Sequence, residues 1–249
     1  MAGHSKWASI KHKKAIVDSR RGQAFTKLTR AITVAAKAGG GDPETNAALG
    51  LAVQKAKDAS MPKDNIERAI AKGTGEGADA DALENVTYEG YGPGGIALLI
   101  ETVTENRNRT GSDVRHILTK HGGSLGEPGS VAYNFDKQGI VLVDAEKYTE
   151  DDLMVAIEAG AEDITVEEGV YEIVAQPGEL SAVRKALDEA GVDVQSSDVV
   201  QNPKARVAID EEAAAKLLRL IDALEDNDDV DSVHANFDID AETLDRLMA

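Results

Sequence analysis

The sequence predicts an α+β multidomain protein in which an N-terminal helical domain precedes two α+β domains. Three observations predict this class. Apolar residues recur every three or four positions up to about residue 73, which is typical of helices. Short Val- and Ile-rich runs then alternate with helical segments, and a Gly- and Asp-rich stretch at 73–81 separates the two patterns. A chain of 249 residues is also long enough for more than one core.

Residues 1–79 are predicted to contain a basic arm followed by a three-helix domain. The first helix is expected from Arg20 to the glycines at 39–41. A second is expected to begin at Asp42-Pro43, which would supply an N-cap and an N1 proline. The third follows Met61-Pro62 and stops at Gly73.

Residues 80–135 and 203–249 are expected to form one discontinuous α+β domain. The first segment offers strands at 86–89 and 96–103 and a helix at 109–121. The second offers a strand at 206–209, a helix at 212–224 capped by Asp210, and a strand at 232–239. Glycines at 90–95 match G-x-G-x-x-G, but a strand and not a helix follows them, so they predict a hairpin turn.

Residues 136–202 are expected to form an inserted ferredoxin-like domain. Their pattern is β-α-β-β-α-β, with Thr149 and Asp152 interpreted as a capping box for the first helix. The elements are expected at 140–143, 151–159, 164–166, 171–175, 180–190 and 192–195.

Charge is divided unevenly along the chain. The first 37 residues hold nine Lys or Arg and one acid, Asp18, a net charge of +8 in a chain whose total is −18. The other residues therefore carry a net charge of −26. A basic arm on an acidic body attracts polyanions at one end, which predicts a nucleic-acid binder.

The candidate contacts are the basic residues of this region and its Trp, the only Trp of the chain. An indole among cations can stack on a nucleic-acid base. The alternatives are that the cations form a solvated face and that Trp7 anchors a helix in the core. The candidates are Lys6, Trp7, Lys11, His12, Lys13, Lys14, Arg20, Arg21, Lys27 and Arg30.

A second candidate cluster, residues 106–110, opens the helix that follows the second strand. Arg107 and Arg109 with free helix N–H groups could hold a phosphate. The alternative is a helix cap whose arginines pair with Glu101 or Glu105.

No catalytic constellation or metal-ligand spacing is found in the sequence. The acidic run at 225–229 lacks the glycine and closing glutamate of a calcium loop and is interpreted as a solvated turn. The chain has no Cys, no apolar run of about 20 residues and no signal-like N-terminus. We therefore expect a cytoplasmic protein that is not an enzyme, requires no cofactor and does not enter the membrane.

Several motifs together resemble the YebC family, and the similarity spans the whole chain. They are Ala2–Trp7, Ile10–Lys14, Asp18–Gly22, Tyr88–Gly95, Asn106–Thr110 and Gly129–Phe135. The resemblance implies a helical domain followed by two α+β domains and a non-enzymatic cytoplasmic regulator of gene expression. Members are described either as DNA-binding transcriptional regulators or as ribosome-associated translation factors.

The residues of the arm favour RNA, and ribosomal RNA in particular, as the partner. The arm before Arg20 has no Asn or Gln to read adenine, and no heptads indicate a dimer, so we expect a monomer. A basic arm with one aromatic suits irregular RNA, whose unpaired bases are open to stacking. DNA is the alternative, and a third is an acidic scaffold that would not need the arm.

Overall fold

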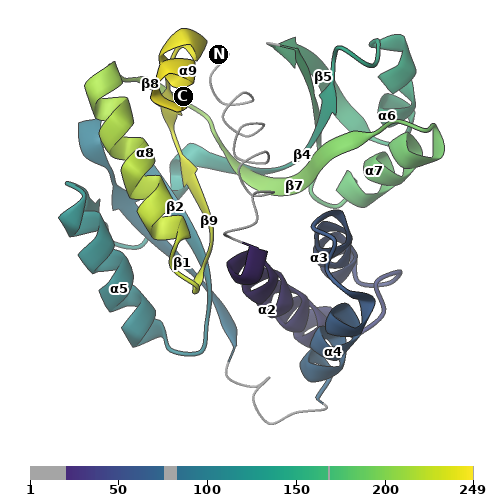
Figure 1. The fold of residues 1–249 in the computed structure, drawn as a ribbon, viewed down its shortest axis with the longest axis horizontal. Coiled ribbons are helices and arrows are strands. Elements are labelled where there is room, and N and C mark those ends of the chain that lie inside the picture. Colours follow the sequence, from purple (N-terminus) through teal and green to yellow (C-terminus); the bar gives the residue numbers. More distant parts are fainter. Residues whose placement is uncertain (1–20, 76–82, 168, 249) are drawn as a thin grey trace. The chain divides into compact units, whose positions relative to one another are not determined.

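The computed structural model describes residues 21–75, 83–167 and 169–248 (Figure 1). These residues divide into two compact units. One contains 21–134 and 209–237, and the other contains 135–208 and 238–248. The predicted α+β class, with a helical N-terminal region and a ferredoxin-like middle region, is confirmed.

Three helices, α2 (Arg21–Gly39), α3 (Ala47–Asp58) and α4 (Lys63–Gly73), form the helical region. Ile32 and Leu49 are fully buried in its core. A Cβ at Gly73 would collide with the carbonyl oxygen of Thr33, so the glycine allows α4 to end close against α2. The predicted ends of the first and third helices are confirmed.

The predicted start of the second helix is wrong, because Asn46 and not Asp42 caps it. Asn46 Oδ1 accepts a hydrogen bond from the N–H of Leu49 at 3.1 Å. Asp42 instead forms a turn, in which its Oδ1 accepts from Glu44 N and its carbonyl accepts from Asn46 N. The side-chain oxygen of Asp42 therefore satisfies a local N–H that precedes the helix.

The first sheet has the order β3-β1-β2-β9 and pairs three strands of residues 84–125 with one strand of residues 230–235. Strands β1 and β2 form an antiparallel hairpin, which confirms the prediction for the glycine motif. Gly94 in its turn has φ 76°, a left-handed conformation that glycine adopts without strain. Helices α5 and α8 pack against the sheet (Figure 1). The elements are β1 (Glu84–Tyr91), β2 (Ala97–Thr104), α5 (Arg107–Lys120), β3 (Ser124–Leu125), α8 (Glu211–Glu225) and β9 (Val230–Ala235).

The second sheet has the antiparallel order β5-β6-β4-β7, the order of a ferredoxin-like βαββαβ unit. Its last strand is longer than the sequence pattern predicts, because polar residues continue the pairing with β4 as far as Phe135 and Pro203. The elements are β4 (Phe135–Asp144), η5 (Asp151–Leu153), α6 (Met154–Glu158), β5 (Ala161–Glu167), β6 (Val170–Ala175), α7 (Leu180–Glu189) and β7 (Val194–Pro203).

The Thr149–Asp152 capping box is only half formed. The Asp152 carboxylate accepts hydrogen bonds from the N–H and the hydroxyl of Thr149, at 2.8 and 2.7 Å. The N–H of Asp152, which would donate to the Thr149 hydroxyl in a complete capping box, donates instead to the Thr149 carbonyl oxygen at 3.2 Å.

Short elements complete the described chain. The expected strand at 206–209 is reduced to β8 (Val207–Ala208), which pairs with β10 (Phe237–Asp238). The expected strand at 232–239 is divided between β9 and β10. A turn, η4 (Ala132–Asn134), precedes β4, and the unpredicted helix α9 (Ala241–Met248) follows β10.

Candidate nucleic-acid interface

The basic face of α2 contacts the turn formed by residues 225–229, hereafter the acidic turn. Arg30 Nη1 donates to Asp229 Oδ1 at 2.7 Å and to the carbonyl oxygen of Asp228 at 2.9 Å. Lys27 Nζ donates to the carbonyl oxygen of Glu225. Lys27 and Arg30 are three residues apart on one helix face, so both reach the same turn.

Asp229 is the centre of this contact. Its second oxygen, Oδ2, accepts from Arg109 Nη2 and from the hydroxyl of Thr110, both at 2.7 Å. The side chain is only 6% exposed. Burial alone would raise the pKa of its carboxyl, but the hydrogen bonds from Thr110, Arg109 and Arg30 outweigh it and hold the pKa below its ordinary value.

Local hydrogen bonds fix the segments that supply these groups. Asn106 caps α5 by accepting from Arg109 N at 3.1 Å, and the hydroxyls of Thr104 and Thr110 are 2.7 Å apart. On the other side, Asn227 Oδ1 accepts from Asp229 N at 2.9 Å. Both sides of the ion-pair cluster are therefore positioned by short-range hydrogen bonds of Asn and Thr side chains.

The cluster bears out part of the helix-cap interpretation of residues 106–110. Asn106 is a helix cap and Arg109 is ion-paired, but its partner is Asp229 and neither Glu101 nor Glu105. The interpretation of residues 225–229 as a solvated turn is wrong for Asp229, since two arginines from distant segments enclose it. Arg107 is 66% exposed and lies 3.7 Å from Glu84 Oε1.

The predicted contacts fall into three groups. Lys27, Arg30 and Arg109 are brought together around the acidic turn, whereas Arg107 lies apart from it. Arg21 is the first residue of α2. The remaining candidates lie outside the described residues: Lys6, Trp7, Lys11, His12, Lys13, Lys14 and Arg20.

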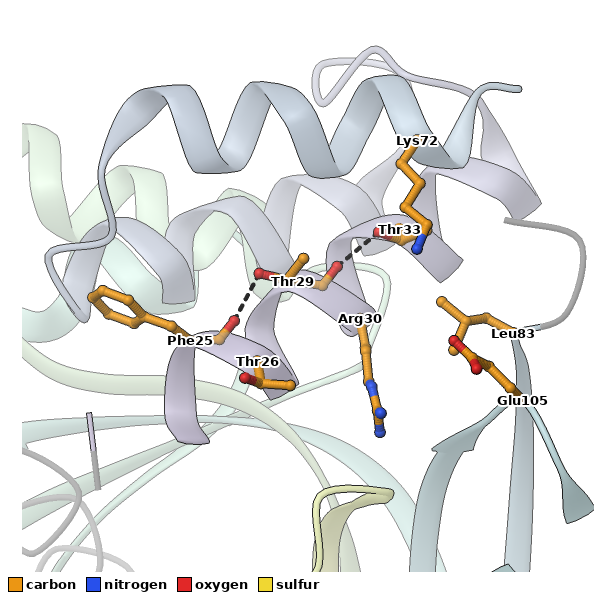
Figure 2. Close-up of a pocket in the computed structure, with 8 residues that line it drawn as sticks. All are labelled: Phe25, Thr26, Thr29, Arg30, Thr33, Lys72, Leu83 and Glu105. Carbon is orange, nitrogen blue, oxygen red and sulfur yellow. Dashed lines mark hydrogen bonds between the residues drawn. The ribbon is translucent and has the colours of Figure 1, made fainter. Parts of the chain in front are cut away.

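A groove of about 320 Å³ runs beside α2 (Figure 2). The Thr29 and Thr33 hydroxyls donate to helix carbonyl oxygens at 2.7 and 2.8 Å, so their protons are already used. The charged residues of the groove are Arg30, Lys72 and Glu105. Its lining residues are Phe25, Thr26, Thr29, Arg30, Thr33, Lys72, Leu83 and Glu105.

Glu89 joins two of the motifs that suggested the family. Its buried carboxylate accepts three backbone N–H groups, from Gly129 and Val131 at 2.6 Å and from Ala132 at 2.8 Å. Burial would raise the pKa of Glu89, but these three hydrogen bonds lower it below its ordinary value. Tyr91 also donates its hydroxyl to the carbonyl oxygen of Ser130 at 3.2 Å. The glycine-rich hairpin thus holds the loop before β4.

Ser232, His234 and Glu101 form a cluster that resembles a catalytic triad only in composition. His234 Nε2 lies 3.1 Å from Ser232 Oγ and 3.2 Å from Glu101 Oε2. A triad uses the two ring nitrogens separately, one for the nucleophile and one for the acid. Within the described ranges, no three His, Cys, Asp or Glu residues are placed to hold a metal ion. Nor is any helix in those ranges long and apolar enough to cross a membrane.

Family models match most of the chain. The model described as "TACO1/YebC protein N-terminal domain" matches residues 5–76, and "TACO1/YebC second and third domain" matches residues 83–237.

Close relatives and a solved structure agree with these matches. A "Probable transcriptional regulatory protein" of Rubrobacter xylanophilus is 55% identical over 245 residues, 98% of each chain. A protein of the same description from Persephonella marina is 52% identical over 250 residues, which cover 99% of this chain and all of its own. The crystal structure of a conserved hypothetical protein, Aq1575, from Aquifex aeolicus superposes with a TM-score of 0.79. It is 47% identical, with 90% of this chain and 92% of that chain covered.

Proposed function

This chain belongs to the TACO1/YebC family, and we propose that it is a nucleic-acid-binding regulator of gene expression that docks through its basic N-terminal arm. The observation that best supports this proposal is the uneven distribution of charge along the chain. The first 37 residues have a net charge of +8, and the remainder has −26. A phosphate backbone is attracted to the arm and repelled by the body, so the protein binds by one end.

The ion pairs of α2 narrow the proposed set of contacts. Arg30 and Arg109 share the carboxylate of Asp229, and Lys27 donates to the carbonyl oxygen of Glu225, so the three cations are less available to a phosphate backbone. The main docking groups are therefore Lys6, Lys11, Lys13 and Lys14, with His12, Arg20 and Arg21 beside them and Trp7 as the stacking residue.

The favoured partner is RNA, and specifically ribosomal RNA, so that the protein acts in translation. The arm offers cations and one indole but no Asn or Gln before Arg20 to read a base pair in a groove. An indole stacks only on a base that has left its helix, and RNA loops present such bases. In this proposal the protein acts in the cytoplasm as a monomer, without a cofactor and without catalysis.

A DNA-binding transcriptional regulator is the second candidate. The names of the Rubrobacter xylanophilus and Persephonella marina relatives favour it. A scaffold that acts only through protein contacts is the third, and it would leave the basic arm without a role.

A competition titration at fixed ionic strength tests the choice of partner. Labelled stem–loop RNA is bound to the protein and displaced either by unlabelled RNA or by duplex DNA of equal length. We expect RNA to compete more strongly, and Trp7→Ala to weaken RNA binding by about 1–3 kcal/mol while Trp7→Phe retains most of it. If duplex DNA binds tenfold more tightly than the RNA, a difference of about 1.4 kcal/mol, the protein is instead a DNA-binding transcriptional regulator.

A further inference from the structure

Helix α5 is basic although the rest of the chain beyond residue 37 is strongly acidic. Its fourteen residues contain four Lys or Arg and one acid, Asp113. The same helix carries His116, and another histidine, His121, forms its C-cap. A basic helix in a body of net charge −26 needs a physical explanation.

The bases of α5 lie on its solvent side. Thr110, Val114 and Leu118, four residues apart, are buried and face the core. The opposite side carries Arg115, His116 and Lys120, all exposed, whereas Asp113 is only partly exposed. Exposed polar residues accompany these bases along the helix: Asn108, Ser112 and Thr119.

Arg115, His116 and Lys120 have no acidic partner among the described residues. None of the three forms an ion pair with another described residue. The residues three and four positions from Arg115 and Lys120 on α5 include no acid, so the sequence supplies no local partner.

Several bases on other helices form ion pairs within their own helix. On four helices, bases are paired with an acid four residues away. The pairs are Lys63–Glu67 on α4, Arg184–Asp188 and Lys185–Glu189 on α7, Lys216–Glu212 on α8, and Arg246–Glu242 on α9. Single exposed bases without an ion pair to another described residue also occur elsewhere, as at Lys57 on α3 and Arg219 on α8. Helix α5 differs because it carries Arg115, His116 and Lys120 together on one face.

We infer that the exposed side of α5 is a second RNA-binding surface, on which Arg115, His116 and Lys120 bind backbone phosphates. This inference rests on the proposed function and extends it from the arm to the folded domain. At 1.5 Å per residue, α5 is about 21 Å long, enough to follow a stretch of RNA backbone.

The composition of this surface favours RNA over an acidic protein. Protein interfaces are anchored by aromatic and large apolar side chains, and the exposed side of α5 has none. Cations with interspersed Ser, Thr and Asn are the groups that bind phosphate and sugar oxygens. Such contacts would fix the orientation of the folded domain on the RNA.

The test compares three variants of the full chain in binding to a fluorescein-labelled stem–loop RNA over a range of salt concentrations. The α5 variant is Arg115→Gln/Lys120→Gln. The matched control is Lys137→Gln/Lys185→Gln, which changes the net charge equally at exposed lysines of β4 and α7. The arm variant is Lys11→Gln/Lys13→Gln/Lys14→Gln. Gln is a good helix former, so α5 should persist, and circular dichroism checks this.

We expect the α5 variant to bind the RNA about tenfold more weakly, with a slope of log K against log salt about 1.5 less steep. The control should stay within about twofold. If the α5 and control variants lose RNA affinity equally, the loss reflects the change in net charge alone, and the inference is overturned. Unchanged RNA binding by the α5 variant would overturn it too, even if duplex DNA binding fell.

The arm variant separates this inference from the proposed function. If it loses RNA affinity while the α5 variant does not, only the second surface is rejected. If neither loses affinity, both the docking arm and the second surface are rejected.

Discussion

Arg30 and Asp229 are 199 residues apart in the sequence, yet Arg30 Nη1 lies 2.7 Å from Asp229 Oδ1. The pair joins the helical region to the turn between α8 and β9, and Arg109 completes it from the start of α5. The hydrogen bonds of a single carboxylate thus connect three parts of the chain that are distant in sequence.

Replacing Asp229 should therefore destabilise the protein more than replacing its exposed neighbour. Asp229→Ala leaves two guanidinium groups and the Thr110 hydroxyl without their acceptor. Because Arg30 and Arg109 are 23% and 52% exposed, water partly compensates them, and we expect a loss of about 2 kcal/mol in the free energy of unfolding. Asp228→Ala, which removes an exposed carboxylate, should cost less than about 0.5 kcal/mol. Urea unfolding measures both, and equal losses would contradict the central role of Asp229.

Protonation of Asp229 and Glu89 in acid should lower the free energy of unfolding. The pKa of each carboxyl is lowered in the folded protein, so each contributes stability above its unfolded value of about 4. That contribution is lost as the pH falls through the folded pKa, which places the loss between about pH 5 and pH 2. Asp229→Asn and Glu89→Gln should each flatten this part of the stability profile, as measured by urea unfolding at a series of pH values. Parallel profiles for wild type and variants would count against the assignment.

The cap of α3 can be tested directly. Asn46 accepts from Leu49 N and donates to the carbonyl oxygens of Ala35 and Gly40, both at 2.8 Å. Asn46→Ala should cost about 2 kcal/mol in thermal or urea unfolding, since it removes the cap and two further hydrogen bonds. The sequence pattern predicts Asp42 as the cap. Asp42→Ala should cost less than about 1 kcal/mol, because it removes only exposed hydrogen bonds of the turn. The reverse order would restore Asp42 as the cap.

Fragments test the predicted domains, with the inserted domain, predicted at 136–202, extended by one residue at each end to include all of β4 and β7. Residues 135–203 contain every strand of the β5-β6-β4-β7 sheet and should unfold cooperatively when expressed alone. Residues 80–135 lack β9, the neighbour of β2, and should not fold, because one edge of the sheet stays unpaired. Dispersed amide resonances from the 80–135 fragment would show that the discontinuous domain is wrong.

Local signals in the sequence predict much of the fold. The glycines after residue 38 end α2, Asp210 caps α8 through Ala213 N at 2.8 Å, and the Gly-rich motif forms a hairpin. Each depends on residues within a few positions of one another, so a pattern can reveal it.

The exact partners of individual long-range contacts are what the sequence pattern does not reveal. The polar half of β7 has no strand-like apolar alternation and is held in the sheet by its register with β4. In the candidate site, Asp229 looks like any member of an acidic run, and only its contacts with Arg30 and Arg109 distinguish it. The bases of α5 can be read from the sequence, but the sequence alone does not show that they share one exposed face. Their lack of acidic neighbours stands out only when they are compared with paired bases such as Lys63 and Lys216 on other helices.

The salt dependence of RNA binding by the full chain tests the docking arm most directly. If the arm neutralises about five phosphates, log K should fall against log salt with a slope near −4. Lys11→Glu/Lys13→Glu/Lys14→Glu should weaken binding and flatten this slope. Lys63→Glu/Lys137→Glu/Lys185→Glu, with the same change in net charge, should have a much smaller effect. An affinity that does not depend on salt, or that the arm variant leaves unchanged, would contradict docking through the arm.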